Sequence, residues 1–228
     1  MTHLAAQFPR FFTFYNGIFL LEALLRTLGL TAIGCGVGLV LGFAIAVLRR
    51  TRTLVLVPIR ILFILFVELF RRIPFLVTLL LAFYASQVLG FELPLLAIAS
   101  ISVCLIATAY ISEIVRAGLD SVHPNQWDSA AVCNFSLAQT LWLVVVPQAW
   151  RVILPPAFAF FLLFLKDSAL ASQIGVVELT YAGKVLNNRG FAPALSFGTI
   201  LVLYFVLSYP LTRIGQRLEA SLSRSPHH

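Results

Sequence analysis

Long apolar runs with almost no ionisable residue recur along this chain, and they constrain its fold more than any other feature. The stretch from Leu95 to Ser112 contains no charged side chain, and about 20 mainly apolar residues allow a helix to cross a bilayer. Of the 228 residues, 60% are apolar and only 11% are charged, whereas a soluble domain has about a quarter charged residues. The short alternating segments typical of membrane barrels are not visible. The sequence therefore predicts an all-α, polytopic helical bundle in a membrane.

Five membrane spans are expected, in a single transmembrane domain that covers residues 1–228. The second is too long for one straight helix and should break near residues 71–74, because Pro74 lacks an amide proton and restricts Ile73. A polar loop is expected over residues 184–190. Five glycines on the first span should let another helix approach closely, because they have no side chain. They are Gly29, Gly34, Gly36, Gly38 and Gly42. The spans cover approximately residues 17–48, 54–89, 95–118, 152–174 and 194–211.

The distribution of basic residues indicates how the bundle is oriented. The net charge is +7, and it is concentrated beside the spans rather than spread over a surface for nucleic acid. Arginines cluster after the first span and after the last: Arg49, Arg50 and Arg52, then Arg213, Arg217 and Arg224. Because cytoplasmic loops carry an excess of Lys and Arg, the amino terminus is predicted outside, and the carboxyl terminus and residues 120–150 in the cytoplasm.

The most polar interior segment, residues 120–150, lies between the third and fourth spans. A short helix is expected over residues 126–133, with Asp128 in its first turn, where negative charge complements the helix dipole. Asn134 suits the left-handed conformation that ends such a helix.

A second short helix should follow directly. Ser136 and Gln139 have the spacing of a capping box, and Pro147 is expected to stop the helix before it. A helix, a tight turn and a helix facing the cytoplasm indicate an interaction element. The alternative is an amphipathic helix that merely lies in the membrane interface.

Four sequence blocks, taken together, carry a resemblance to a known family. They read E-L-F-R-R-I-P at residues 68–74, A-Y-I-S-E-I-V-R-A-G at 109–118, Q-W-D-S-A from 126 with Pro147 later, and K-D-S-A-L at 166–170. In this order they resemble the permease subunits of bacterial polar amino acid ABC importers, the type I permeases that carry the EAA motif. The chain departs from the family pattern at Asp128, Ser129, Asn134, Arg72 and Ile73, which stand where glutamate, alanine, glycine, glycine and threonine are usual.

The resemblance implies that the helix from Asp128 to Cys133 is a coupling helix, which docks into a groove of a separate cytoplasmic ATPase subunit. The implied coupling residues are Gln126, Trp127, Asp128, Ser129, Ala130, Ala131, Asn134, Ser136 and Pro147. It also implies two ATPase copies that bind ATP and Mg, a second permease subunit, identical or paralogous, a periplasmic amino acid-binding protein, and a bacterial inner membrane location. In this chain, Gly183-Lys184 has no glycine five residues before it, so no nucleotide-binding loop is expected.

Candidate substrate-binding residues are Arg71, Arg72, Pro74, Lys166, Asp167 and Ser168. Lys166 and Asp167 are expected about halfway along the fourth span, where charged residues normally face a partner or a water-filled path. The alternative is an ion pair with Glu68 or Glu113.

Arg71 and Arg72, at the expected helix break, could hold a carboxylate through bidentate bonds, which predicts a preference for an acidic amino acid. The alternative is that they anchor the helix at the cytoplasmic face.

Other charged residues are expected to be structural. Glu113 and Arg116 are three residues apart and can pair on one helix face, as can Glu22 and Arg26, which are four apart. The role of Glu178 stays open.

Two other functional classes are less well supported by the residues. A membrane-embedded enzyme would need a metal cluster or a nucleophile paired with a base, and the chain is expected to have no catalytic residue and no metal ligand. An ion-coupled secondary transporter would typically carry an internal repeat, and none is found.

Overall fold

The computed structural model describes residues 2–51 and 53–223, and every regular element in this part of the chain is helical. The elements are α1 (Thr2–Phe11), α2 (Phe14–Arg50), η1 (Leu54–Leu56), α3 (Val57–Arg72), α4 (Phe75–Val88), α5 (Leu95–Asp120), α6 (Pro124–Val132), α7 (Leu137–Gln139), η2 (Thr140–Val145), α8 (Val146–Asp167), η3 (Ser168–Ile174), α9 (Leu179–Asn188) and α10 (Pro193–Ser223). The all-α prediction is confirmed. Arg52 and Arg224 of the two basic clusters lie outside the described residues.

Four helical stretches are long and apolar enough to cross a membrane: Phe14–Arg50, Leu95–Asp120, Leu137–Ile174 and Pro193–Leu222. They correspond to the first, third, fourth and fifth expected spans, and each is longer than predicted. The second span, which was expected to be broken near residues 71–74, consists of two shorter helices, α3 with 16 residues and α4 with 14.

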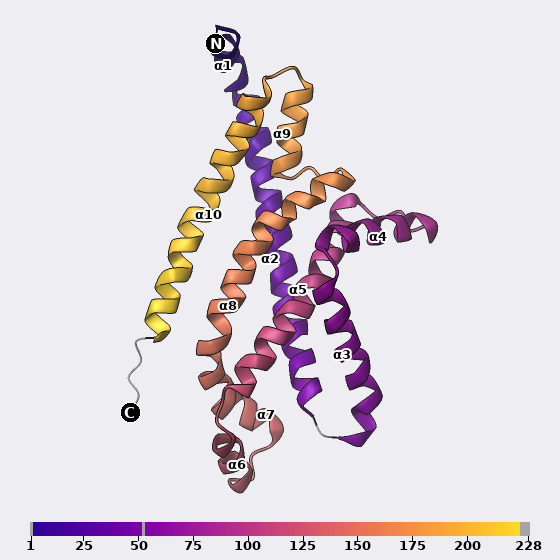
Figure 1. Cartoon of the computed structure of the whole chain (residues 1–228), viewed down its shortest axis with the longest axis vertical. Helices are drawn as coiled ribbons and strands as arrows, with labels where there is room; N and C mark the ends of the chain where they lie inside the picture. The colour runs from indigo at the N-terminus through magenta and orange to yellow at the C-terminus, as the bar shows by residue number, and fades with distance from the viewer. Residues whose placement is uncertain (1, 52, 224–228) are drawn as a thin grey trace.

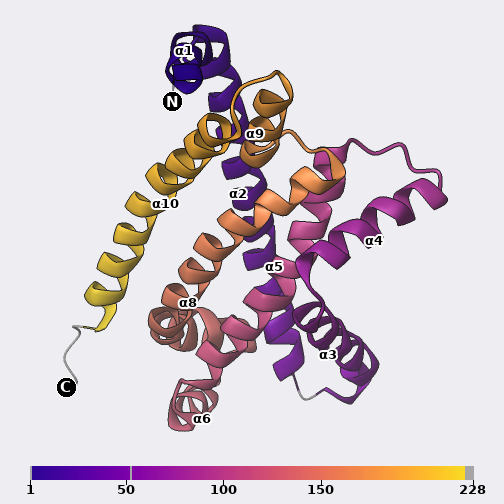
Figure 2. The ribbon, with the colours of Figure 1, turned by 45° about the horizontal axis from the view of Figure 1, so that its top comes forward.

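The break between α3 and α4 lies where the sequence predicts it. Ile73 has extended backbone angles (φ −89°, ψ 133°) and Pro74 precedes the first turn of α4. A residue before proline is pushed out of the helical region, so the chain changes direction here. In Figures 1 and 2, α4 projects from the side of the bundle, away from α10.

The most extensive helix contact joins α2 and α5, which lie side by side (Figure 1), and their carboxyl ends meet where Arg50 pairs with Asp120. Close approach depends on three of the five expected glycines. A Cβ added at Gly34 would lie 2.0 Å from Val103 Cγ1, one at Gly38 2.7 Å from Ala107 Cβ, and one at Gly42 2.8 Å from the Ser112 nitrogen. By contrast, Cβ atoms at Gly29 and Gly36 would meet nothing within 4 Å, so these two glycines do not form the contact.

The fourth helical stretch runs through Pro147, which the sequence predicted as a stop. η2 is a π-helical segment, and α8 begins at Val146 with the proline in its first turn. A first-turn proline loses no helical hydrogen bond because its N–H would be unpaired there anyway. Because the stretch spans Leu137–Ile174, Lys166 and Asp167 lie near its end and not at its middle, which corrects the prediction.

A helix, α9, occupies most of the stretch expected to be a polar loop. Leu179, Ala182 and Leu186 on one side of α9 are fully buried and join a core cluster with Phe11 and Leu20. Their spacing of three and four residues is that of one helix face. Figure 1 shows α1 and α9 at one end of the bundle, and α6 and α7 at the other.

Candidate functional site: the α6 segment and its charge network

The segment α6–α7 is fixed by local caps. The α6 helix begins at Pro124, and Nδ1 of His123 accepts a hydrogen bond from the Asn125 nitrogen at 3.2 Å. Proline favours the first helical position, so α6 starts two residues earlier than predicted. Asp128 consequently lies in the second turn, and its placement in the first turn was wrong.

The turn after α6 follows the prediction. Asn134 has a φ of 56°, in the left-handed region. The expected capping box is present: the Ser136 nitrogen donates to Oε1 of Gln139 at 2.8 Å, and the Gln139 nitrogen donates to Oγ of Ser136 at 3.3 Å. The two short helices are therefore held at a defined angle by their own sequence.

Two of the implied coupling residues face the bundle instead of solvent. Ala130 is only 3% exposed. Trp127 is half-buried, and the guanidinium carbon of Arg50 lies 4.0 Å from the centre of its ring, so this side chain fastens α6 to the end of α2 through a cation–π contact. The exposed members of the set are Gln126, Asp128, Ser129, Ala131, Asn134, Ser136 and Pro147.

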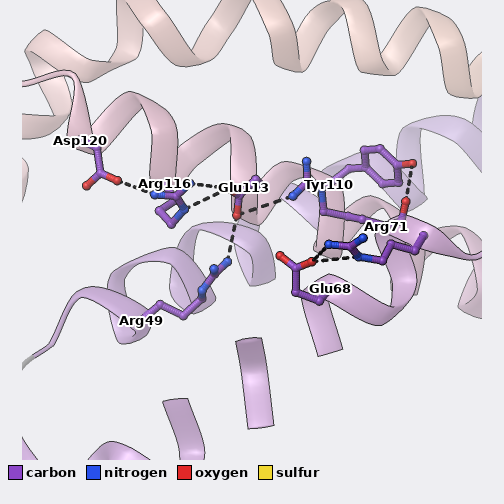
Figure 3. A network of polar contacts seen from close by, with 8 residues as sticks. Arg49, Glu68, Arg71, Tyr110, Glu113, Arg116 and Asp120 are labelled. Atoms are coloured by element: carbon purple, nitrogen blue, oxygen red, sulfur yellow. Dashed lines mark hydrogen bonds and ion pairs between the residues drawn. The ribbon is translucent and has the colours of Figure 1, made fainter. Parts of the chain in front are cut away.

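A charge network runs from the α6 end into the bundle. Figure 3 shows the part of this network that surrounds Glu113. Glu113 on α5 is its hub, because its carboxylate accepts hydrogen bonds from Nη1 of Arg49 at 3.1 Å and from Nε of Arg116 at 3.0 Å. Arg71, at the end of α3, lies 3.9 Å from the same carboxylate. The predicted pairing of Glu113 with Arg116 is confirmed, and it is only one part of a larger cluster.

The network continues towards α6. Nη1 of Arg116 donates to Asp120 at 2.6 Å, and Asp120 also accepts a hydrogen bond from Arg50. Since Arg50 covers the Trp127 ring, a chain of ionic and cation–π contacts links the helix break after α3 to α6. The Glu22–Arg26 pair, at 4.0 Å, lies on α2 outside this network.

The two arginines at the break do not converge on one empty site. Nη2 of Arg72 donates to Glu68 at 2.7 Å, and the Arg72 side chain is 79% exposed. Arg71 points towards Glu113, and its carbonyl oxygen accepts a hydrogen bond from the Tyr110 hydroxyl at 3.1 Å. Pro74, which follows them, is exposed.

The second group of candidate substrate residues lies at the end of α8. Lys166 is exposed, Asp167 is half-buried, and the buried Ser168 donates its hydroxyl hydrogen bond to the Leu165 carbonyl at 2.8 Å. The alternative pairing of Lys166 with Glu68 or Glu113 is not formed among the described residues, since those carboxylates contact arginines.

An aromatic cluster joins the two candidate groups. Phe75, just after the break, lies 5.0 Å from Phe164, centroid to centroid. Tyr110, which holds the Arg71 carbonyl, stacks on Phe160 at 5.1 Å, and Phe160 lies 5.2 Å from Phe164. The break and the Lys166 region therefore adjoin the same packed rings.

Glu178 has a role that the sequence left open. Its side chain is fully buried and caps α9, accepting hydrogen bonds from the nitrogens of Thr180 at 2.9 Å and Tyr181 at 2.8 Å. The Tyr204 hydroxyl donates to it from α10 at 3.1 Å. Burial raises the pKa of this carboxyl above its ordinary value, although these hydrogen bonds oppose the shift. Negative charge just before a helix is favoured by the helix dipole, but α9 itself was not predicted.

Comparison with known proteins agrees with this architecture. Residues 38–224 match the family described as binding-protein-dependent transport system inner membrane component. A curated relative, the "probable glutamine ABC transporter permease protein GlnP" of Bacillus subtilis, is 31% identical over 80% of this chain and 86% of its own. The arginine ABC transporter permease protein ArtQ of Haemophilus influenzae is 30% identical over 89% and 92%. A solved amino acid ABC transporter crystallised with histidines superposes with a TM-score of 0.81 and 27% identity over 90% and 94%.

This helical membrane bundle, with its capped helical segment at one end, belongs to the family of inner membrane components of binding-protein-dependent transport systems. More narrowly, it is a permease of the amino acid ABC transporter type, a non-enzymatic multi-pass membrane subunit whose ATPase lies on a separate chain.

Proposed function

We propose that this chain carries a polar amino acid into the cytoplasm by alternating access, and that α6 receives the motion of a separate ATPase subunit. The observation that supports this most is the exposed, capped α6, joined through Arg50 and the Glu113 network to the break after α3. Small exposed side chains at Ser129 and Ala131 leave room for a groove of a partner to approach. Packed ionic contacts of this kind can transmit a rigid-body movement between elements.

The proposed assembly has two ATPase copies that bind ATP and Mg, a second permease, identical or paralogous, and a periplasmic amino acid-binding protein. In the proposed orientation the α6 end of the bundle is cytoplasmic and the amino terminus is periplasmic. Arg49 and Arg50 lie next to α6, since both line a cavity with Trp127 and Asp128, in agreement with the excess of basic residues on the cytoplasmic side of membrane proteins.

For the substrate we propose an acidic amino acid, recognised by Arg71. Arg49 and Arg116 contact Glu113 directly, at 3.1 Å and 3.0 Å, whereas Arg71 is 3.9 Å away and 35% exposed. Arg71 therefore keeps donors that a substrate carboxylate can use, while Arg72 is engaged by Glu68. Relatives are named for glutamine and arginine, so their names do not select the charge of the substrate.

Coupling is tested by purifying the chain with its ATPase and measuring ATP hydrolysis stimulated by the loaded binding protein. Ser129→Arg on the exposed side of α6 should abolish the stimulation, because a long charged side chain prevents close docking. Ser221→Arg near the end of α10 is the matched control and should leave it unchanged. Equal stimulation in both variants would contradict the docking role.

The substrate is tested by uptake of an amino acid panel into vesicles that contain the same assembly. Glutamate or aspartate should be taken up, and Arg71→Gln should weaken uptake of the acidic amino acid by about tenfold or more, as expected when a charged hydrogen bond is removed. Strong uptake of arginine with none of glutamate would refute the acidic preference while leaving the ATPase coupling intact.

A further inference from the structure

A cavity of about 830 Å³ opens at the α6 end of the bundle, and it shares Arg50, Trp127 and Asp128 with the proposed coupling contacts. Its walls come from the end of α2, the segment before α3, the end of α5, and the α6–α7 segment. Four arginines line it: Arg49, Arg50, Arg60 and Arg116. The cavity therefore adjoins α6, and Arg60 is the lining arginine that neither the coupling role nor substrate binding uses.

The lining is cationic. Its carboxylates are Asp120 and Asp128, and Glu113, outside the lining, binds Arg49 and Arg116, so four guanidinium groups face three acids and a formal charge of +1 remains. Asp120 is already bonded to Arg50 and Arg116. A cavity with this balance attracts anions.

Arg60 is the arginine best placed to bind one. Nη1 of Arg60 donates to the Thr51 carbonyl at 2.8 Å, which holds the side chain in place. No carboxylate lies within ion-pair distance of Arg60 among the described residues, whereas Arg49, Arg50 and Arg116 each contact one. The guanidinium of Arg60 thus keeps its charge uncompensated and has further donors free for an oxyanion.

The rim of the cavity is apolar. Leu137 and Leu141 form part of its wall. Leu54 and Val55, which follow the lining residue Thr53, are 84% and 83% exposed. Apolar side chains this exposed at the end of a membrane bundle are suited to acyl chains, so the cavity combines a cationic interior with an apolar edge.

We propose that this cavity binds the phosphate head group of an anionic phospholipid, such as phosphatidylglycerol, with Arg60 as the main phosphate ligand. Basic pockets at the ends of membrane helices hold such head groups. The apolar rim selects a lipid over a free phosphate ion. The site requires only that this end of the bundle lies at a membrane surface. It shares part of its wall with the coupling segment, but its main ligand, Arg60, belongs to neither the coupling nor the substrate residues.

The test is native mass spectrometry of the purified full-length chain, mixed with equal amounts of phosphatidylglycerol and phosphatidylcholine. The wild type should retain phosphatidylglycerol preferentially. Arg60→Gln should reduce that retention about fivefold, the change expected for about 1 kcal/mol per basic residue near a membrane. Arg60→Lys, which keeps the charge, should retain most of it.

Arg151→Gln is the control, since Arg151 is an exposed arginine at the start of α8 that does not line the cavity. It should leave lipid retention unchanged. An unaltered unfolding temperature of Arg60→Gln would show that the variant is folded. Equal retention of both lipids by the wild type, or equal effects of Arg60→Gln and Arg151→Gln, would overturn the proposal. Displacement of the lipid by excess inorganic phosphate would overturn the choice of a lipid as the occupant.

Discussion

At the scale of single residues, one carboxylate holds together the contacts at the α6 end. Glu113 is 19% exposed, and the Arg49 side chain that binds it is only 11% exposed. Replacing Glu113 with glutamine would leave Arg49, Arg71 and Arg116 close together without their shared counter-ion. Such a cluster is destabilised by mutual repulsion and by the unpaired buried charge.

We therefore expect Glu113→Gln to lower the free energy of unfolding by about 1–3 kcal/mol, measured by denaturant unfolding of the purified protein. Glu68→Gln is the matched control, because it removes a carboxylate paired with the exposed Arg72. It should have little effect, since exposed ion pairs contribute little. An equal loss in both variants would argue against a hub at Glu113.

Glu178 gives a prediction on pH. Its pKa is raised in the folded protein above the ordinary value of 4.5, so between these two pKa values the folded state binds more protons than the unfolded chain. The free energy of unfolding should then fall as the pH rises through this interval. Glu178→Gln should flatten this slope, and it should also lose up to about 1 kcal/mol of capping energy. Unfolding curves at several pH values test this, and an unchanged slope in the variant would contradict it.

Residue roles that depend on local chemistry could be predicted from the sequence, and those that depend on tertiary contacts could not. The left-handed Asn134 and the Ser136–Gln139 box need only neighbours in the chain. Arg49 reaches Glu113 across 64 positions, and no local spacing reveals such a contact.

At the scale of helices, proline and glycine explain both the correct and the wrong predictions. Pro74 breaks the helix as expected, whereas Pro147 does not, because it enters the first turn of α8 directly after a π-helical segment. Whether a proline ends one helix or begins the next depends on the geometry before it, which hydropathy does not encode. Similarly, α9 is amphipathic, and its polar side resembles a loop in the sequence.

The contact between α2 and α5 gives a prediction at this scale. Gly42→Ala should destabilise the protein by about 1–3 kcal/mol, the usual cost of overpacking, because its Cβ would lie 2.8 Å from a backbone nitrogen. Gly36→Ala is the control, since nothing lies within 4 Å of its Cβ, and alanine is favoured over glycine in helices. The midpoint of thermal unfolding should therefore be lowered by Gly42→Ala and not by Gly36→Ala. A lowered midpoint for both variants would contradict this account of the packing.

At the scale of the whole molecule, the arrangement separates two ends. One carries α1 and α9, and the other carries α6 (Figure 1). Glu178 caps α9 at its start, whereas Arg49 and Arg50 line the cationic cavity beside α6. The all-helical bundle and the place of α6 between the third and fourth expected spans could be predicted from hydropathy and motif order. The sideways course of α4 could not, since it depends on its packing against α5 and η3.

The central claim, that α6 faces the cytoplasm and docks onto an ATPase, can be tested with a native cysteine. Cys133, directly after α6, is exposed, whereas Cys35 is buried and Cys104 is half-buried. A membrane-impermeant maleimide applied to inside-out and right-side-out vesicles measures its accessibility, and Cys133→Ala gives the background. We predict labelling of Cys133 only in inside-out vesicles, and protection when the ATPase subunit is bound. Labelling from the outer side, or undiminished labelling in the presence of the ATPase, would contradict the account.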